Sequence, residues 1–195
     1  LLDENFFVNE QEQKNRYELH NNSLDDDGYK NYLEKFFSVS LNLAFGKESV
    51  SELDFLDYGS GPVPCLAELI RQKNIFASVS FYDLFFAPNL VENKKFDFVT
   101  CLEVAEHFEN PIDDFSKISN LLKNDGKIAI QTQFLENSPC FVENKFCYDK
   151  FCRWWYKEDC THVSFYTKKG IFECVKRVGL EVFAEEKNLV IFRKV

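Results

Sequence analysis

The sequence predicts a three-layer α/β fold whose sheet is mostly parallel. From residue 53 onward, short apolar segments of strand length alternate with amphipathic segments of helix length, which is the pattern of a sheet covered by helices on both faces. Hydrophobic residues, including 22 Phe, make up 45% of the 195 residues, so we expect one domain with a Phe-rich core. The last two apolar segments adjoin each other and predict a C-terminal antiparallel hairpin.

Residues 1–50 precede this alternation and are expected to form a helical cap or lid. Residues 6–20 indicate one helix and residues 25–45 a second, whose aspartate-rich start suits a helix N-terminus because carboxylates cap the free amide groups there. Apolar side chains recur at helical spacing along the second helix, at Phe36, Phe37, Leu41 and Phe45. The second helix therefore has one apolar face.

Residues 51–195 are expected to form the main domain. Its strands are predicted over residues 53–58, 75–83, 95–102, 127–134, 180–186 and 188–195. Its helices are predicted over residues 65–74, 111–123 and 167–179. Pro111 near the start of one helix and Gly179 at the end of another occupy positions that these residues favour. Residues 135–166 are aromatic, rich in Cys and without a clear period, so we interpret them as an insertion after the fourth strand.

The composition narrows the classes of function. A net charge of −9 disfavours a nucleic-acid partner, since phosphate binding needs a positive field. No apolar run reaches the roughly 18 residues of a membrane span, and no signal peptide is visible, so we expect no membrane partner. Four of the seven Cys crowd residues 140–160 and admit a metal or a disulfide, but free thiols in a reducing cytoplasm are the favoured interpretation. The oligomeric state is not indicated.

A glycine-rich turn follows the first strand of the main domain. In DYGSGPVP, which begins at Asp57, Gly59 and Gly61 let backbone amides approach a ligand at the carboxyl end of the sheet. Asp83 follows this turn at the spacing of an acidic ribose ligand and ends the second strand, where its carboxylate can accept hydrogen bonds from ribose hydroxyls. The loop has no third glycine, which weakens a nicotinamide-dinucleotide interpretation; that interpretation and an ordinary strand–helix turn stay open at this point.

Four segments, taken in order, carry a family resemblance: LDFLDYGSGPVPCLAELI, FYD, FDFVTCLEVAEHFENP and LLKNDGKIAIQT. They resemble the class I S-adenosylmethionine-dependent methyltransferases over residues 53–134 and, with the closing helix and hairpin, over about residues 50–195. WWYKEDCTHVSFYT further resembles a branch of small bacterial methyltransferases. The resemblance implies a Rossmann-like fold, S-adenosyl-L-methionine as cofactor and an enzyme that transfers the cofactor's methyl group.

The resemblance also implies roles at the strand ends. It places the methionine part of the cofactor against Gly59, Ser60 and Gly61, with Asp57 orienting the loop and the methionine amino group. The residues expected to face the methionine and ribose from the third strand are Cys101, Leu102 and Glu103.

At the nucleoside end, the resemblance assigns the ribose to Asp83 and the neighbourhood of the adenine to Leu84. The stretch that leads from Asp83 to Asp97 is short for this family. The family's usual intervening helix and strand are therefore shortened or missing, and the acidic residue that often contacts the adenine amino group has no counterpart.

The acceptor side of the site is expected in the insertion, which should hang over the cofactor's methyl group. His162 is a candidate base or substrate-orienting residue, with Asp159 beside it, and His107 in EVAEH is a third catalytic candidate. Aromatic side chains could wall a substrate pocket, namely Trp154, Trp155 and Tyr156. The alternatives are a hydrophobic anchor for the Trp pair and a structural hydrogen bond for His162. From the N-terminal helix, Tyr17 could reach the cofactor or substrate, as could His20, or both could lie on a solvated face.

A divalent metal site is a weaker alternative. If residues 103–107 are helical, Glu103, Glu106 and His107 share one face, and His162 could join them from the insertion. Similar ExxEH segments bind a metal in small-RNA 2′-O-methyltransferases and ubiquinone O-methyltransferases, but many metal-free relatives share the segment. We therefore expect no metal and keep this four-residue set as the alternative.

These patterns together predict methyl transfer by in-line displacement to an oxygen or nitrogen of a small or medium-sized metabolite. The alternatives are a metal-assisted RNA methyltransferase and a non-catalytic homologue that binds S-adenosylmethionine. The expected partner is a small-molecule acceptor.

Overall fold

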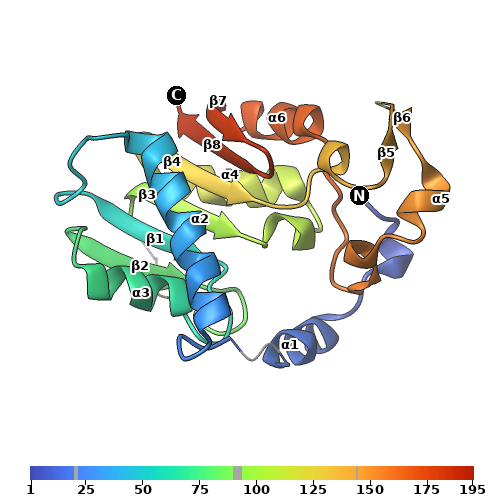
Figure 1. Cartoon of the computed structure of the whole chain (residues 1–195), viewed down its shortest axis with the longest axis horizontal. Helices are drawn as coiled ribbons and strands as arrows, with labels where there is room; N and C mark the ends of the chain where they lie inside the picture. The colour runs from blue at the N-terminus through green and yellow to red at the C-terminus, as the bar shows by residue number, and fades with distance from the viewer. Residues whose placement is uncertain (20–21, 90–93, 144) are drawn as a thin grey trace.

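The computed structural model describes residues 1–19, 22–89, 94–143 and 145–195, and it confirms the predicted three-layer α/β fold (Figure 1). Six strands form one sheet in the order β2-β1-β3-β4-β8-β7. Their bounds are β1 Asp54–Tyr58, β2 Ser78–Tyr82, β3 Phe96–Leu102, β4 Leu122–Gln131, β7 Leu180–Glu186 and β8 Leu189–Lys194. β8 runs antiparallel to both of its neighbours, which confirms the predicted C-terminal hairpin, and the other neighbouring pairs are parallel.

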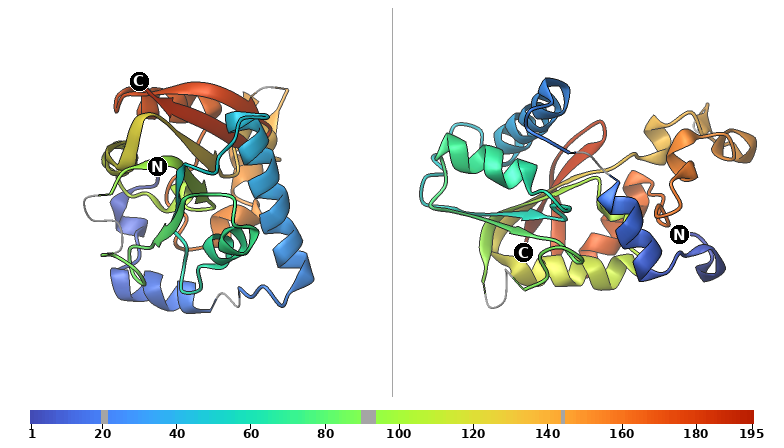
Figure 2. Two further views of the ribbon diagram at one scale, coloured as in Figure 1. Left: turned by 90° about the vertical axis from the view of Figure 1, so that its left-hand side faces the viewer. Right: turned by 90° about the horizontal axis from the view of Figure 1, so that it is seen from below.

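Helices cover both faces of the sheet. Figure 2 shows α2 (Asp27–Phe45) and α3 (Cys65–Lys73) on one face, with α4 (Pro111–Leu121) and α6 (Lys168–Lys176) on the other. The layer below α2 and α3 is rich in Phe, including the fully buried Phe55 and Phe98. Because these two residues are paired across β1 and β3, their side chains point to the same face of the sheet. Burial of these rings is what fixes the register of the central strands.

Local signals start α2 and α4, and end α2, at or within two residues of the predicted positions. The Asp26 side chain accepts a hydrogen bond from the Tyr29 amide at the start of α2, and Gly46 ends the helix with a φ of 59°. The Asn110 side chain caps α4 in the same way, with Pro111 in the first turn. These caps satisfy amide groups that have no partner inside the helix.

The two helices of the predicted cap over residues 1–50 lie in different parts of the molecule. α2 buries Leu33, Phe36 and Phe37 against the sheet and is therefore one of the helices that flank it. α1 (Glu10–Glu18) lies at the carboxyl ends of the parallel strands (Figure 2). This helix begins at a capping box formed by Asn9 and Glu12. It is shorter than the helix that the sequence predicts over residues 6–20. His20 lies outside the described residues.

The sheet ends at β2 among the residues that the structure describes. After β2 the chain turns back at once, with Asp83 and Ala87 paired as an isolated bridge, and re-enters the sheet at β3. The shortened connection expected between Asp83 and Asp97 is therefore present, and the described part of it contains no helix or strand. The described residues that directly follow β2 therefore form a loop at the carboxyl end of the sheet.

The insertion over residues 135–166 contains only short elements. They are η3 Leu135–Asn137, β5 Phe141–Val142, β6 Lys145–Phe146, α5 Tyr148–Phe151 and η4 Trp155–Glu158. They pack around a small cluster of their own, which contains the buried Cys140, Trp154 and Tyr156. All seven Cys are free thiols. None of the described helices is long and apolar enough to cross a membrane.

Candidate active site

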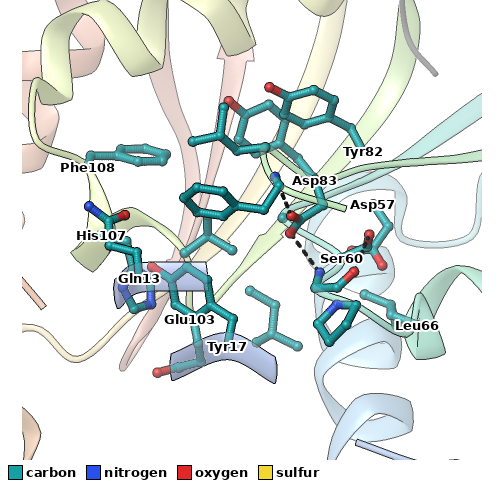
Figure 3. A pocket seen from close by; sticks show the side chains of 18 of the residues that line it. Gln13, Tyr17, Asp57, Ser60, Leu66, Tyr82, Asp83, Glu103, His107 and Phe108 are labelled. Atoms are coloured by element: carbon teal, nitrogen blue, oxygen red, sulfur yellow. Dashed lines mark hydrogen bonds between the residues drawn. The ribbon is translucent and has the colours of Figure 1, made fainter. Parts of the chain in front are cut away.

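A pocket of about 620 Å³ opens at the carboxyl ends of β1, β2 and β3. Its floor is made by the loops that follow these strands, and α1 and the first turns of α2 form its opposite wall. Figure 3 shows two groups of side chains across this space. Asp57, Ser60 and Asp83 lie at one end, and Tyr17 and His107 lie toward the other, so we describe the two ends in turn.

The glycine-rich loop is held against the end of β2. The amides of Gly59 and Ser60 both donate to the carbonyl oxygen of Tyr82, at 2.8 and 3.0 Å. Gly59 has a φ of 81°, and a Cβ placed on it would lie 2.4 Å from a methyl carbon of Val104. Gly61 has a φ of 67° and faces open space. Both positions therefore require glycine, the first also for lack of room.

Asp83 holds this loop through its carboxylate. Oδ2 accepts a hydrogen bond from the Gly61 amide at 2.9 Å, and Oδ1 accepts from the amides of Phe85 and Phe86 at 2.9 and 3.1 Å. The side chain lines the pocket although only 9% of the residue's surface is exposed. Leu84 is 64% exposed and also lines the pocket.

Asp57 is buried at the end of β1, below the loop. The Thr100 hydroxyl lies 3.4 Å from its Oδ1, and its carboxyl group lines the pocket floor. Burial raises the pKa of Asp57 to about 7, against the lowering effect of the Thr100 hydroxyl. A positively charged group placed beside it would favour the ionised form.

The end of β3 corrects one of the predicted residues. Leu102 and Glu103 line the pocket, but Cys101 does not: its side chain is fully buried in the core on the α4 and α6 side of the sheet. Successive side chains of a strand point to opposite faces, so Cys101 and Leu102 cannot face the same space. Burial raises the pKa of the Cys101 thiol, which keeps it neutral.

Residues 103–107 do not form the helix on which the predicted metal site was based. Glu103 has a φ of 51°, and only Ala105–His107 form a single 3₁₀ turn, η2. Glu103 still lines the pocket, where its Oε1 lies 3.4 Å from the Gln131 amide nitrogen. Burial and the neighbouring Glu106 raise the pKa of Glu103 to about 8.

The short turn nevertheless brings Glu106 and His107 to His162. One ligand atom from each of these three residues lies within 4.8 Å of the other two. His107 lines the pocket and contacts the Tyr17 ring in an edge-to-face arrangement, with 5.3 Å between ring centroids. His162 lies behind His107, with 4.8 Å between their centroids, and is not among the described residues that line the pocket. Burial and His107 lower the pKa of His162 to about 4, so the imidazole is neutral at neutral pH.

Asp159 is held by hydrogen bonds and an ion pair with neighbouring residues. Its carboxylate accepts hydrogen bonds from the Thr161 amide and hydroxyl and forms a 2.7 Å ion pair with Arg16 of α1. It is not among the described pocket-lining residues. Asp159 therefore ties the insertion to α1 instead of facing the pocket.

The predicted aromatic wall lies away from the pocket. Trp154 and Tyr156 are buried in the insertion's own cluster, which favours the hydrophobic-anchor alternative for Trp154, and Trp155 is 68% exposed. The Tyr156 hydroxyl lies 3.1 Å from that of Thr132, which donates to Glu106. Of the four aromatic residues predicted to bind substrate, the structure brings only Tyr17 to the pocket.

Much of the remaining wall was not predicted. The residues concerned are Glu10, Gln13, Tyr29, Tyr32, Phe85, Glu109, Asn110, Asp113, Asp114 and Lys117. Tyr29, Tyr32 and Leu33 recur at helical spacing at the start of α2, which is the one sequence signal that could have indicated this wall. The other residues lie on α1, on the loop after Asp83 and on the loop and helix after His107, and they become neighbours only through the fold.

The family follows from the sequence match. Residues 29–185 match the family model described as a methyltransferase domain. The chain belongs to this methyltransferase family. A stretch of 43 residues is also 44% identical to the ubiquinone biosynthesis O-methyltransferase of Glaesserella parasuis serovar 5 (strain SH0165). That stretch is 22% of this chain and only 18% of that protein's length.

Solved structures share the methyltransferase's fold. An O-methyltransferase family protein from Burkholderia thailandensis is 13% identical, with a TM-score of 0.56 over 93% of this chain and 61% of that chain. The N-methyltransferase NodS from Bradyrhizobium japonicum WM9, solved in complex with S-adenosyl-L-homocysteine, is 14% identical, with a TM-score of 0.54 over 94% of this chain and 97% of that chain. The expected family, Rossmann-like fold, enzyme class and S-adenosyl-L-methionine cofactor are confirmed.

The residues of the pocket fit this cofactor. The loop of Gly59, Ser60 and Gly61, which we call the glycine cradle, has no room for a Cβ at Gly59. It therefore brings backbone atoms close to a ligand in the pocket. Among the described lining residues, seven are acidic and one is a lysine, Lys117. This excess of negative charge suits a ligand with a sulfonium and an ammonium group. The volume also falls in the range of about 300–1,000 Å³ that small-molecule sites occupy.

Proposed function

We propose that this methyltransferase transfers the methyl group of S-adenosyl-L-methionine to an oxygen or nitrogen of a small or medium-sized metabolite. The observation that carries the proposal is the single pocket that runs from the glycine cradle to Tyr17 and His107. Its second end is lined by α1 and by the loop after β3, so a separate acceptor has a place beyond the cofactor. An acceptor on RNA is disfavoured by the net charge of −9 and by the acidic lining.

Each polar group at the cofactor end has one role in this proposal. Gly59, Ser60 and Gly61 hold the methionine part, and Asp57 faces the methionine ammonium group from below. The Asp83 carboxylate accepts three backbone amides. Since a carboxylate has about four lone-pair sites, it keeps capacity for a ribose hydroxyl. Leu84, Leu102 and Glu103 complete this end as pocket-lining residues.

The transfer itself needs alignment more than acid–base chemistry. The cofactor supplies an electrophilic methyl group, whose bond to sulfur breaks with the electron pair left on the sulfur. The acceptor atom forms the new bond to the methyl carbon, and a hydroxyl acceptor also releases its proton. Tyr17 and His107 line the acceptor end, so they hold the acceptor in line, and the His107 imidazole is placed to take up that proton.

The partner and location follow from the same features. We infer that the acceptor is a small molecule, because it shares a pocket of about 620 Å³ with the cofactor. We place the protein in the cytoplasm, where its seven free Cys would stay reduced.

Methyl transfer to a panel of hydroxyl and amine metabolites tests the proposal. The chain is incubated with S-adenosyl-L-methionine that carries a labelled methyl group, and labelled products are measured by mass spectrometry. At least one acceptor class is expected to gain the label, with release of S-adenosyl-L-homocysteine. Cofactor binding without turnover across the panel would contradict the proposal and favour the non-catalytic homologue.

A further inference from the structure

The pocket continues past Asp83 into a third part, on the α4 side of the sheet. We propose that this part binds the adenine ring of the cofactor, with Tyr58 and Tyr82 against the ring and the Asp114 carboxylate accepting a hydrogen bond from its amino group. Three observations support this site: the direction in which the pocket runs, a pair of tyrosine rings, and a carboxylate oxygen that has no described partner. The site depends on the cofactor and is independent of the proposed acceptor.

The direction of the pocket follows from the order of its residues. The glycine cradle takes the methionine part and Asp83 takes the ribose, and in Figure 3 Asp83 lies between Ser60 and Tyr82. The ribose carries the methionine part and the adenine on two different carbons, so an extended cofactor continues past Asp83 and away from Ser60. The lining residues in that direction are Tyr58, Tyr82, Phe108, Asp114 and Lys117.

Two tyrosine rings form an aromatic wall in this part of the pocket. Tyr58 and Tyr82 are partners in the register of β1 and β2, so their side chains leave the sheet on the same face. Their ring centroids are 4.9 Å apart, with 32° between the ring planes. A purine is planar and aromatic, and it packs on such rings whatever its substituents. The tyrosines therefore suit a base without selecting which base binds.

The edge position of β2 gives α4 its role. β2 is the outer strand of the six-stranded sheet, and no described strand pairs beyond it to carry the acidic residue that this family often places there. Asp114 and Lys117 lie one turn apart on α4, and both line the pocket. Burial raises the pKa of Tyr82. The charge of Lys117 lowers it, and the charges of Asp83 and Asp114 raise it further, so these three groups lie close to the hydroxyl.

Asp114 supplies the hydrogen-bond acceptor. Its Oδ1 lies 2.7 Å from the Lys117 Nζ in an ion pair. Its side chain is only 18% exposed, and no described residue donates a hydrogen bond to its Oδ2. An ionised carboxylate only accepts hydrogen bonds, whereas the amino group of adenine donates them. The second oxygen of Asp114 and the amino group are therefore complementary.

This arrangement makes the site selective for the amino group of the base. A purine without that group would leave the second oxygen of Asp114 unpaired, and a purine with an oxygen in its place would set two acceptors against each other. The tyrosine rings contribute affinity for any purine, and Asp114 contributes the selectivity. An acidic residue on a helix thereby replaces one that the family carries on a strand.

Calorimetry of the full chain with two ligands tests the site. One ligand is S-adenosyl-L-homocysteine, and the other is its analogue whose purine lacks the amino group. We expect the wild type to bind the first at least about 10-fold more tightly, because a hydrogen bond to a charged group is lost with the amino group. Asp114→Ala should bind the two ligands within about threefold of each other. The matched control is Glu68→Ala, which removes the acidic partner of Arg71 from a similarly spaced ion pair on α3 and should keep the wild-type preference.

Circular dichroism shows whether each variant is folded. If Asp114→Ala does not fold, the isosteric Asp114→Asn decides, because its neutral amide oxygen accepts a weaker hydrogen bond and the preference should be smaller than that of the wild type. Equal binding of the two ligands by the wild type, or the full wild-type preference in the variant that decides, would overturn the proposal. A chain that shows the preference but transfers no methyl group to any acceptor would instead contradict the proposed function and leave the adenine site standing.

Discussion

The two ends of the pocket differ in how their buried carboxylates are satisfied. Asp83, at the cofactor end, accepts three backbone amides from its own loop and from the glycine turn. Glu106, at the acceptor end, has one oxygen held by Thr132 and one with no partner among the described residues. Both oxygens of Asp83 are therefore paired by the protein itself, whereas Glu106 keeps one buried oxygen that no described residue pairs.

The same difference appears in the chain segments that build each end. Gly59, Gly61 and Asp83 follow two adjacent strands, β1 and β2, that are also consecutive in the sequence. Glu106 and His162 come from segments that are distant in the sequence, joined by the amides of Val163 and Ser164, which both donate to the Glu106 carbonyl oxygen. The first end depends on local backbone geometry, and the second depends on how the insertion packs.

Replacement of Gly59 by Ala is the largest expected disturbance of the cofactor end. The added Cβ would lie 2.4 Å from Val104 and would also hold an L-residue at a φ of 81°. Overpacking costs about 1–3 kcal/mol and left-handed strain about 1–2 kcal/mol, so we expect a loss of about 2–5 kcal/mol in the free energy of unfolding, measured by urea denaturation.

The matched control for Gly59 is Gly179→Ala. Gly179 has a φ of 76° and open space around it, so only the left-handed strain applies there. Equal losses of stability in the two variants would show that the close contact with Val104 does not constrain the loop. That result would contradict the interpretation that the cofactor end is preformed.

The pH dependence of cofactor binding is a second, smaller test of the same end. The Asp57 pKa is raised to about 7 by burial, and a cationic ligand favours its ionised form. Affinity for S-adenosyl-L-homocysteine should therefore be constant above pH 7 and fall below it, by up to about 10-fold per pH unit.

The pH dependence of folding stability has the opposite sign to that of cofactor affinity. Asp57→Asn is the control for both. Because the folded-state pKa is the higher one, the stability contributed by Asp57 is full below its unfolded value of about 4 and is lost as the pH rises to about 7. In Asp57→Asn both pH dependences should be flattened. A wild-type affinity that does not change between pH 6 and 8 would contradict the proposed contact with the ammonium group.

The smallest expected effect concerns the contact between α1 and the insertion. Arg16 and Asp159 form an ion pair in which Arg16 is partly exposed, and exposed pairs contribute about 0–1 kcal/mol. Arg16→Ala should change the Michaelis constant for the acceptor by no more than about fivefold, with the turnover number nearly unchanged. A drop in turnover comparable to that of a pocket variant would instead return Asp159 to the catalytic role first predicted for it.

The sequence was sufficient to predict the cofactor end because its signals are local. The strand, the glycine turn and the next strand end follow one another, and a parallel sheet brings consecutive strand ends to the same edge. Cys101 was wrongly included because the resemblance covers the whole segment, while the alternation of side chains along β3 sends Cys101 and Leu102 to opposite faces.

The acceptor end was less accessible to prediction. The local helix expected over residues 103–107 is a single 3₁₀ turn, yet Glu106, His107 and His162 still converge, because backbone contacts of Glu106 with the insertion decide their placement. The spacing of residues also does not predict which aromatic side chains of an irregular segment face inward. Trp154 and Tyr156 pack among themselves, and Trp155 faces solvent.

The division of the pocket into two ends is tested most directly by calorimetry of S-adenosyl-L-homocysteine binding to two variants. Asp83→Ala should weaken binding about 100-fold or more, since it removes a charged acceptor from the ribose and frees three amides that fix the loop. His162→Ala should leave the affinity within about threefold of the wild type, because His162 lies outside the described pocket lining, but should lower turnover, because it supports His107 at the acceptor end. Wild-type affinity in Asp83→Ala, or an equal loss in both variants, would contradict the account.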